Sequence, residues 1–308
     1  MVKKQSIIPK RLLKGDYIGV VAPASPFDHD NLVAGVNVLK SLGFRLIIPE
    51  DIFEKKGYLA GGDEQRASLL NRLFADEAIK AIFCARGGFG SLRILPLLDY
   101  ASIKNNPKIF IGYSDITAIL SVITQKTGLV TFHGPMVTEL CNADKRTIDS
   151  INSVLLHCGK IEITSDEGAV INHGSASGKI AGGNLTTLCH LVGTPYEPDL
   201  NGHILFLEEK GEALYRIDRM LTHMKLAGCF AGLAGLAIGS FEECGEIGEI
   251  YSIVKNVFKD LDIPILAGFE IGHGNVNLSV PLGLGATLST RKLKISFDES
   301  ATEYGCHG

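Results

Sequence analysis

The sequence has no tryptophan, no long basic run and no apolar run that approaches the length of a membrane-spanning helix. The missing tryptophan removes the commonest aromatic platform for carbohydrates, although it excludes no class of substrate. A helix that spans a bilayer needs about 20 mostly apolar residues, so we expect no membrane as a partner. With a net charge of −4 and no basic run, nucleic acid is not an expected partner either.

Paired cysteines are also missing, because the seven cysteines are scattered along the chain without a CxxC spacing. An odd and dispersed set is typical of reduced thiols in a cytoplasmic protein, and it argues against a disulfide framework or a zinc site. Residues 1–14 include basic side chains but no apolar stretch long enough for a signal peptide. We therefore predict a cytoplasmic protein without a metal site.

What the chain does have is the composition of a globular protein, with 45% apolar and 21% charged residues among 308. In the first half, short apolar runs alternate with segments whose apolar residues recur at helical spacing. The expected strands are 16–23, 44–48, 79–84, 109–111 and 129–132, and the expected helices are 31–42, 63–74, 91–98 and 145–157, with another after residue 114. This alternation predicts an α/β domain over residues 1–165, with a parallel sheet of Rossmann or flavodoxin type covered on both faces.

The pattern changes at residues 160–172, which are polar and rich in turns and are expected to form short strands. Beyond them, the expected strands are 178–181, 203–207, 233–239 and 263–267, the expected helices are 184–191, 213–226 and 247–258, and residues 286–297 alternate like a hairpin. This half is predicted to be a second domain over residues 166–308, of mixed α+β class with more antiparallel pairing. Two domains also agree with the length of the chain.

Three loops of the first half follow predicted strands, at residues 23–26, 86–90 and 112–114. Ligands of parallel sheets bind beyond the carboxyl ends of the strands. We therefore expect these three loops to converge in space and to form part of a binding site.

The run at residues 109–116 reads as a strand, a sharp turn and a helix, with Gly112 permitting the turn. Ser114 then stands at a helix start, where its hydroxyl is held away from the sheet and free N–H groups face any developing negative charge. A serine nucleophile needs these conditions. The alternative is that Ser114 only caps the helix. The stretch is not G-x-S-x-G, so the common α/β-hydrolase turn is not matched.

A serine nucleophile also needs a base and an acid that orients the base. His273 lies between two glycines after a predicted strand, and His133, which also follows a strand, is its rival as the base. Glu208 comes at the end of an apolar strand and is the best-placed acid. Alternation puts Glu208 and Glu209 on opposite faces, so only one of them can point into a site. The alternative is that both are a solvated strand terminus.

The run Arg-Gly-Gly-Phe-Gly at residues 86–90 offers backbone N–H groups to an oxyanion or to a phosphate. It fits neither the dinucleotide fingerprint nor GxxxxGK[ST], which favours acyl chemistry over nucleotide binding. Arg86 is a candidate for binding a substrate carboxylate, with a structural ion pair as the alternative. Arg216 and Arg219, three residues apart on one predicted helix, are expected in a structural or interface role.

Together, several stretches resemble the LD-carboxypeptidases, serine peptidases of the muramoyl-tetrapeptide carboxypeptidase type, with the microcin C self-immunity peptidases as a sister branch. The stretches fall in the family's order over nearly the whole chain, and their combination is highly specific although no single one is. They are residues 19–26, 85–91, 112–115, 133–136, 182–185, 205–209, 216–221 and 272–274.

The resemblance implies a Ser-His-Glu triad in which Ser114 is the nucleophile, His273 the base and Glu208 the acid. It also implies an oxyanion hole made by the backbone N–H groups of Gly88 and Asp115. The nucleophile would belong to the N-terminal domain and the acid and base to the C-terminal domain, so the site is expected at the domain interface. The family uses no metal and no other cofactor, works in the cytoplasm and usually forms homodimers.

The reaction that the resemblance implies is the release of terminal D-alanine from murein tetrapeptides by hydrolysis of an LD-peptide bond, in peptidoglycan recycling. Phe89 stands where the family often has tyrosine, which removes a hydroxyl but leaves the backbone of Gly88 unchanged. The chain lacks the tryptophan-bearing insert of the immunity branch, which favours the cell-wall branch. Two alternatives stay open: a peptidase of acyl-sulfamoyl or acyl-phosphoramidate nucleotide conjugates, and a non-catalytic protein that binds a small ligand on the same scaffold.

Overall fold

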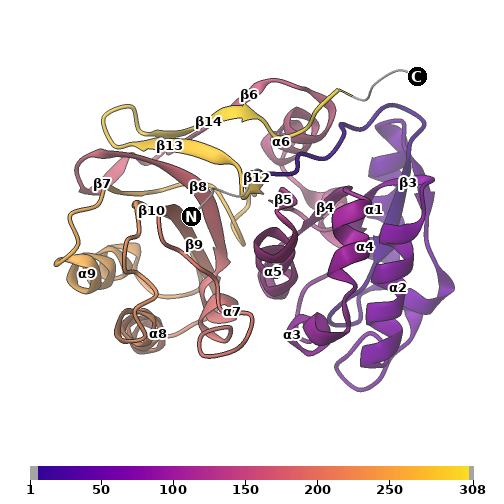
Figure 1. The fold of residues 1–308 in the computed structure, drawn as a ribbon, viewed down its shortest axis with the longest axis horizontal. Coiled ribbons are helices and arrows are strands. Elements are labelled where there is room, and N and C mark those ends of the chain that lie inside the picture. Colours follow the sequence, from indigo (N-terminus) through magenta and orange to yellow (C-terminus); the bar gives the residue numbers. More distant parts are fainter. Residues whose placement is uncertain (1–5, 305–308) are drawn as a thin grey trace.

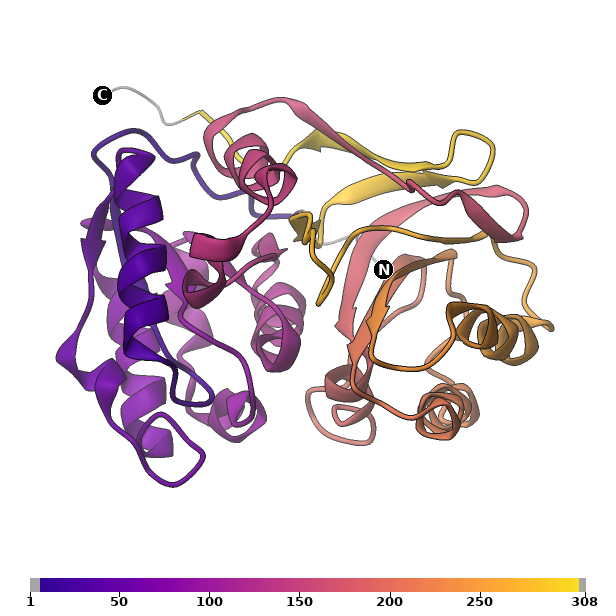
Figure 2. The ribbon, with the colours of Figure 1, turned by 180° about the vertical axis from the view of Figure 1, so that it is seen from behind.

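Two β-sheets with their helices make up the molecule (Figure 1). The computed structural model describes residues 6–304. One half of the molecule is built mostly from the N-terminal residues and the other mostly from the C-terminal residues (Figures 1 and 2). The predicted fold class, a parallel α/β half followed by a mixed α+β half, is confirmed.

The first sheet has five parallel strands in the order β2-β1-β3-β4-β5, which is that of flavodoxin-like sheets, and β12 joins its edge antiparallel to β5. The five parallel strands correspond to the predicted ones, because strands buried on both faces read as continuous apolar runs. The strands are β1 (Tyr17–Val21), β2 (Arg45–Ile47), β3 (Ile79–Cys84), β4 (Ile109–Gly112), β5 (Thr131–His133) and β12 (Val280–Leu282).

Helices cover both faces of this sheet (Figures 1 and 2), since each parallel connection must cross over it. They are α1 (His29–Ser41), α2 (Asp63–Ala75), α3 (Ser91–Ile94), α4 (Tyr100–Asn105), α5 (Thr117–Thr127) and α6 (Lys145–Leu156), with 3-10 segments η1 (Glu50–Phe53), η2 (Leu95–Leu97), η3 (Ser114–Ile116) and η4 (Val137–Asn142). The sequence caps them locally. Asp28 accepts a hydrogen bond from the Asn31 amide before α1, and Gly128 ends α5 in a left-handed conformation.

The second sheet has the order β6-β14-β13-β8-β9-β10-β11-β7, with a parallel centre from β8 to β11 and antiparallel strands on both sides. Its strands are β6 (Lys160–Thr164), β7 (Ala169–Asn172), β8 (Ser175–Asn184), β9 (His203–Lys210), β10 (Gly235–Glu242), β11 (Ile265–Ala267), β13 (Gly285–Ser289) and β14 (Lys294–Ser300), and its helices are α7 (Leu185–Cys189), α8 (Leu214–Leu226) and α9 (Ile247–Phe258). Within residues 6–304, no helix combines the length and the apolar character needed to cross a bilayer.

The two halves exchange one strand each. β6 precedes residue 165 in the chain but pairs with β14 of the second sheet, whereas β12 comes from the C-terminal half and pairs with β5 of the first sheet. In the latter pair, Val280 lies opposite His133. The predicted division at residues 165 and 166 stays a prediction, and the exchanged strands tie the halves together on both sides of it.

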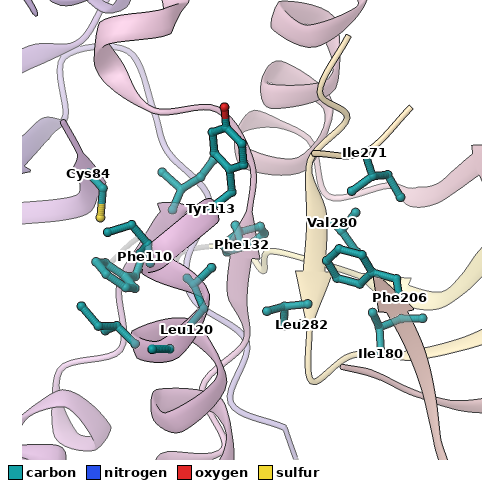
Figure 3. Packing of buried hydrophobic residues seen from close by; sticks show 14 of the residues in the cluster. Cys84, Phe110, Tyr113, Leu120, Phe132, Ile180, Phe206, Ile271, Val280 and Leu282 are labelled. Carbon is teal, nitrogen blue, oxygen red and sulfur yellow. The ribbon is translucent and has the colours of Figure 1, made fainter. Parts of the chain in front are cut away.

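Buried apolar side chains form one cluster that continues from the first sheet into the second. Figure 3 shows Phe132 of the first sheet near Val280 and Leu282 of β12, with Phe206 of β9 beyond them. Each fully buried side chain of this size contributes roughly 1.5–3 kcal/mol. Because this packing runs between the halves, we expect them to move little relative to each other.

Candidate active site

The turn after β4 is strained at Ser114, whose φ is +61°. A left-handed conformation of a residue other than glycine costs on the order of 1–3 kcal/mol and is concentrated at functional sites. We expected Gly112 to make the turn, and this detail is wrong. Gly112 ends the strand, and a Cβ there would lie 2.9 Å from Ile116 and 3.2 Å from Cys84, so close packing requires the glycine.

The hydroxyl of Ser114 caps neither helical segment that follows it. The N-cap position of η3 is Tyr113 and that of α5 is Ile116, and neither makes a side-chain capping hydrogen bond. Within residues 6–304, no group is hydrogen-bonded to the Ser114 hydroxyl. The capping interpretation is therefore wrong. A strained serine between a strand and a helix, with a free and partly exposed hydroxyl, has the geometry of a nucleophile.

The three predicted loops converge around Ser114. A Cβ at Gly87 would lie 3.0 Å from Ser114 Cβ and 3.3 Å from its Oγ. The Ser25 amide donates a 3.1 Å hydrogen bond to the Gly87 carbonyl, and the Phe89 amide donates one of 3.0 Å to Ser25 Oγ. Gly88 has a φ of +102°, and a Cβ there would overlap the Ser25 hydroxyl. The absence of side chains at Gly87 and Gly88 thus lets this loop pack closely against Ser114 and Ser25.

Two backbone amides near Ser114 are available to a ligand. Within the described part of the chain, neither the Gly88 amide nor the Asp115 amide donates a hydrogen bond. The Asp115 carboxylate accepts a 2.8 Å hydrogen bond from the Ser91 amide, which holds this turn to the end of the glycine loop. Free N–H groups in such a place suit a forming oxyanion.

Glu208 and His273 are paired. Glu208 Oε2 lies 2.6 Å from His273 Nδ1; Glu208 is fully buried, and the imidazole is 15% exposed. β9 continues through both glutamates, so Glu208 lies within the strand and not at its end as expected. Gly272 has a φ of +105°, and a Cβ there would overlap the Glu208 carboxylate, which explains the glycine before the histidine.

Burial and pairing oppose each other at both partners. Burial raises the pKa of Glu208, and its hydrogen bond to His273 pulls it down again without cancelling the rise. Burial alone would lower the pKa of His273, but the hydrogen bond and the charge of Glu208 raise it above its ordinary value. The pair therefore favours a protonated imidazole, which a general base must become.

Glu209 faces the other way, as alternation predicts, and its carboxylate is fully occupied. It accepts hydrogen bonds from Asn184 Nδ2 at 2.8 Å, from the Thr186 amide and hydroxyl at 2.8 and 2.6 Å, and from the Lys210 amide at 2.9 Å. The interpretation of the two glutamates as a solvated terminus is wrong, because both are buried. Glu209 ties the start of α7 to β9 and has no lone pair directed at an imidazole.

His133, the rival base, is fully buried between Tyr113 and Phe206, whose ring centroids lie 5.6 and 4.9 Å from its own. Burial lowers its pKa to about 3. Among residues 6–304, neither nitrogen of its ring has a hydrogen-bond partner, whereas His273 has Glu208. In the described chain, neither histidine is hydrogen-bonded to Ser114, but the ring of Tyr113, the residue before the serine, lies 4.7 Å from that of His273.

The three arginines that the sequence analysis singled out, Arg86, Arg216 and Arg219, are exposed. Arg86 donates a 2.8 Å hydrogen bond to the Pro26 carbonyl, and among the described residues no carboxylate forms an ion pair with it. Arg216 contacts Glu212 at 3.4 Å, and both Arg216 and Arg219 lie over the ring of Tyr215, which is consistent with a structural role.

Arg66 is a residue that the sequence analysis missed. It is 2% exposed, and its guanidinium donates to the Pro23 carbonyl, to the Gly90 carbonyl at 3.0 Å and to Asp63 at 2.5 Å. It thereby links two of the loops around Ser114. Its helical spacing from the buried Leu70 and Leu73 on the same face of α2 was the available signal.

Family models and relatives identify the family of the chain. The LD-carboxypeptidase N-terminal domain matches residues 18–134, and the LD-carboxypeptidase C-terminal domain matches residues 177–288. The probable murein peptide carboxypeptidase of Bacillus subtilis (strain 168) is 37% identical over 304 residues, which cover 96% of this chain and 95% of that protein. The microcin C7 self-immunity protein MccF of Escherichia coli is 30% identical, with 97% and 95% covered.

Solved structures share the fold over nearly their whole length. A structure of MccF in complex with aspartyl sulfamoyl adenosine has a TM-score of 0.88 at 29% identity, covering 96% of this chain and 100% of that one. The muramoyltetrapeptide carboxypeptidase from Oxalobacter formigenes has a TM-score of 0.81 at 27% identity, covering 94% and 99%. With both family domains matched in order and relatives aligned from end to end, the chain belongs to the LD-carboxypeptidase family.

Proposed function

We propose that this protein is a serine carboxypeptidase that hydrolyses the LD-peptide bond of murein tetrapeptides and releases the terminal D-alanine. The observation that carries the proposal is the 2.6 Å hydrogen bond between Glu208 and His273, beside the strained turn of Ser114. The names of the relatives from Bacillus and Oxalobacter support the substrate class.

In this mechanism the Ser114 hydroxyl attacks the carbonyl carbon of the bond between the L-centre of the diamino acid and D-alanine. His273 takes the serine proton through Nε2 and passes it to the departing amine. Glu208 keeps Nδ1 protonated and stabilises the imidazolium that forms. Water then hydrolyses the acyl-enzyme, with the same imidazole as base, and Ser114 is restored.

The amides of Gly88 and Asp115 stabilise the tetrahedral oxyanion. Neither amide donates a hydrogen bond within residues 6–304; Gly88 follows Gly87, which lies against Ser114, and Asp115 follows Ser114 in its own turn. Loss of one such donor typically costs about 3–4 kcal/mol of transition-state stabilisation. Asp115 contributes through its backbone, since its carboxylate is engaged by the Ser91 amide.

A carboxypeptidase also has to recognise the free carboxylate at the end of its substrate. Arg86 belongs to the same loop as Gly88, is exposed and has no carboxylate partner among the described residues. Its contact with the Pro26 carbonyl fixes one side of the guanidinium and leaves the others for a bidentate interaction. The proposal further includes a cytoplasmic, homodimeric enzyme that needs no metal or other cofactor.

A second candidate reaction is hydrolysis of an aminoacyl-nucleotide conjugate. A solved relative, MccF, holds aspartyl sulfamoyl adenosine, and here the exposed rings of Tyr58 and Phe89 lie 5.6 Å apart beside Gly88, where a nucleobase could stack. The chain has no tryptophan for this purpose. Murein peptide is favoured because the relative with that name is more similar.

The test is to incubate the purified full chain with a disaccharide-tetrapeptide that ends in D-alanine, with EDTA present, and to follow the products by mass spectrometry. Loss of one alanine is expected, and Ser114→Ala should abolish it while Ser252→Ala, which removes a hydroxyl from α9, should not. An intact tetrapeptide together with cleavage of aspartyl sulfamoyl adenosine would replace the first reaction by the second. Cleavage by Ser114→Ala at the wild-type rate would refute the serine mechanism.

A further inference from the structure

Tyr113, the residue before Ser114, connects the turn of the first sheet with the imidazole supplied by the second half. It is 6% exposed, and its ring lies 4.7 Å from that of His273 at an interplanar angle of 57°. The same ring lies 5.6 Å from His133. Figure 3 shows its hydroxyl pointing away from the apolar cluster beneath it.

Glu139 holds the far end of this tyrosine. The Tyr113 hydroxyl donates a 2.7 Å hydrogen bond to Glu139 Oε1, and the Met136 amide donates one of 3.1 Å to Glu139 Oε2. Because both oxygens have a donor, the carboxylate is fixed within η4. Burial and the neighbouring Glu139 charge raise the pKa of Tyr113 well above its ordinary value, so the hydroxyl stays a donor.

Within residues 6–304, the ring of His273 has one hydrogen-bond partner, Glu208, although only 15% of the side chain is exposed. Its neighbours in sequence are Gly272 and Gly274, which have no side chains, and Glu208 holds only Nδ1. A single hydrogen bond at Nδ1 leaves the imidazole plane able to tilt about that bond. The ring of Tyr113 packs against this plane from the side of Ser114's own turn, and an anchored ring there limits the tilt.

We propose that Tyr113 and Glu139 are a positioning pair for His273: the anchored tyrosine ring keeps Nε2 aimed at Ser114, and the Glu139 carboxylate stabilises the imidazolium formed during the reaction. Neither side chain exchanges a proton in this scheme, so both act through His273. The inference rests on the proposed serine mechanism and adds two residues to it.

The charges around His273 allow the contribution of Glu139 to be separated from the others. Burial opposes protonation of His273, whereas the carboxylate of Glu208 first and those of Glu139 and Glu209 next favour it. His133 repels the imidazolium only when it is itself protonated, and burial lowers its pKa to about 3. The groups that act on His273 are thus Glu208 of β9, Glu139 of η4, His133 of β5 and Tyr113 after β4, with Glu209 acting by its charge from the opposite face of β9.

The test combines steady-state kinetics with an NMR titration of the His273 ring in the full chain, its signals assigned by their loss in His273→Gln. Tyr113→Phe keeps the ring but frees it from Glu139, and we expect kcat to fall about tenfold with KM within about twofold. Glu139→Gln keeps an acceptor but removes the charge. We expect it to lower both kcat and the pKa of His273.

The chain offers a matched control, because Tyr251 donates a 3.0 Å hydrogen bond to Glu167 away from the site. Tyr251→Phe and Glu167→Gln should leave kcat and the His273 titration unchanged. If Tyr113→Phe and Glu139→Gln behave like these controls in both measurements, the positioning pair is refuted. A wild-type chain that cleaves no peptide would refute the proposed function alone, since the titration in Glu139→Gln still decides whether Glu139 acts on His273.

Discussion

At the scale of single residues, the two adjacent glutamates of β9 differ in their hydrogen-bond partners. Within the part of the chain that the structure describes, Glu208 pairs with His273 and its Oε1 has no partner, whereas Glu209 accepts from Asn184, Thr186 and Lys210. A carboxylate whose one partner is a histidine can stabilise a positive charge that forms on that ring. A carboxylate held by four donors has no such role and instead stabilises the fold.

We therefore expect Glu208→Gln to lower kcat on the order of 10³–10⁴-fold with little change in Tm, because it removes the charge that favours the imidazolium. Glu209→Ala should retain kcat per folded molecule but lose stability, since it leaves buried donors unpaired at roughly 1–3 kcal/mol each. Peptide hydrolysis and thermal unfolding, measured on both variants, check this. The reverse pattern would assign the catalytic acid to Glu209.

The pH dependence follows from the direction of the His273 shift. A base must be neutral, so kcat/KM should rise with pH through the folded pKa of His273, which lies above the ordinary 6.5. The favoured imidazolium also stabilises the fold. This contribution is complete below the unfolded pKa and is lost as pH rises through the folded one. Profiles of kcat/KM and Tm against pH should therefore run in opposite directions there, and His273→Gln should flatten that change in Tm.

At the scale of elements, Arg66 shows how α2 supports loops that belong to two other strands. Its guanidinium donates to the Pro23 carbonyl after β1 and to the Gly90 carbonyl after the glycine run. Gly88, the proposed oxyanion donor, belongs to the same loop as Gly90, and the amide of the next residue, Phe89, is bonded to Ser25. We therefore expect the position of the Gly88 amide to depend on the buried guanidinium of Arg66.

Arg66→Lys should destabilise the protein by about 3 kcal/mol, because one ammonium cannot span the same acceptors and leaves buried groups unpaired. We expect kcat to fall as well, since the loop that carries Gly88 loses its anchor. Arg72→Lys is the control, because Arg72 lies on the same helix with 60% of its side chain exposed, where a change of about 0.5 kcal/mol is typical. The measurements are urea denaturation followed by circular dichroism and kcat, on both variants. If the two variants lose the same stability and the same kcat, the anchoring role of Arg66 is wrong.

Elements with strong periodicity could be predicted from the sequence, and those defined by distant partners could not. β3 and α9 agree with the prediction at both ends, because each has an uninterrupted pattern between clear breaks. β12 was missed, since Val-Pro-Leu is short and contains Pro281, which is tolerated only because β12 is an edge strand. β7 lies in residues 160–172, where short strands were expected, but its bounds were not predicted because this polar stretch read as a passage between domains.

The candidate site shows the same division. Ser114, Glu208 and His273 could be selected because glycines, strand ends and the family's motifs surround them. Tyr113 and Glu139 could not, because nothing local pairs residues that are 26 positions apart and meet only when η4 folds back on β4. The strain at Ser114 was also beyond local patterns, since Gly112 appeared to be the natural turn residue.

At the scale of the whole molecule, the exchanged strands make the two halves depend on each other. A fragment of residues 1–165 keeps β5 but lacks β12, and it carries β6 without β14. Apolar side chains that face Phe206 and Val280 would also be exposed. We therefore expect the two halves to fold as one cooperative unit and not as independent domains.

We expect the fragment 1–165 to remain without a stable fold, as judged by circular dichroism and dispersion of its NMR spectrum, whereas co-expression with residues 166–308 should restore a folded complex. The full chain should unfold in one transition, with far-ultraviolet dichroism and tyrosine signals coinciding. Two separate transitions, or a fragment with native-like spectra, would show that the halves fold independently.

The late position of β12 and His273 has a consequence during synthesis. β12, which completes the first sheet, and His273 are synthesised after all the other strands of that sheet. Until then the nascent protein presents the open edge of β5, which another chain could extend. We therefore expect chains that end before His273 and β12 to be inactive and to associate through the open β5 edge.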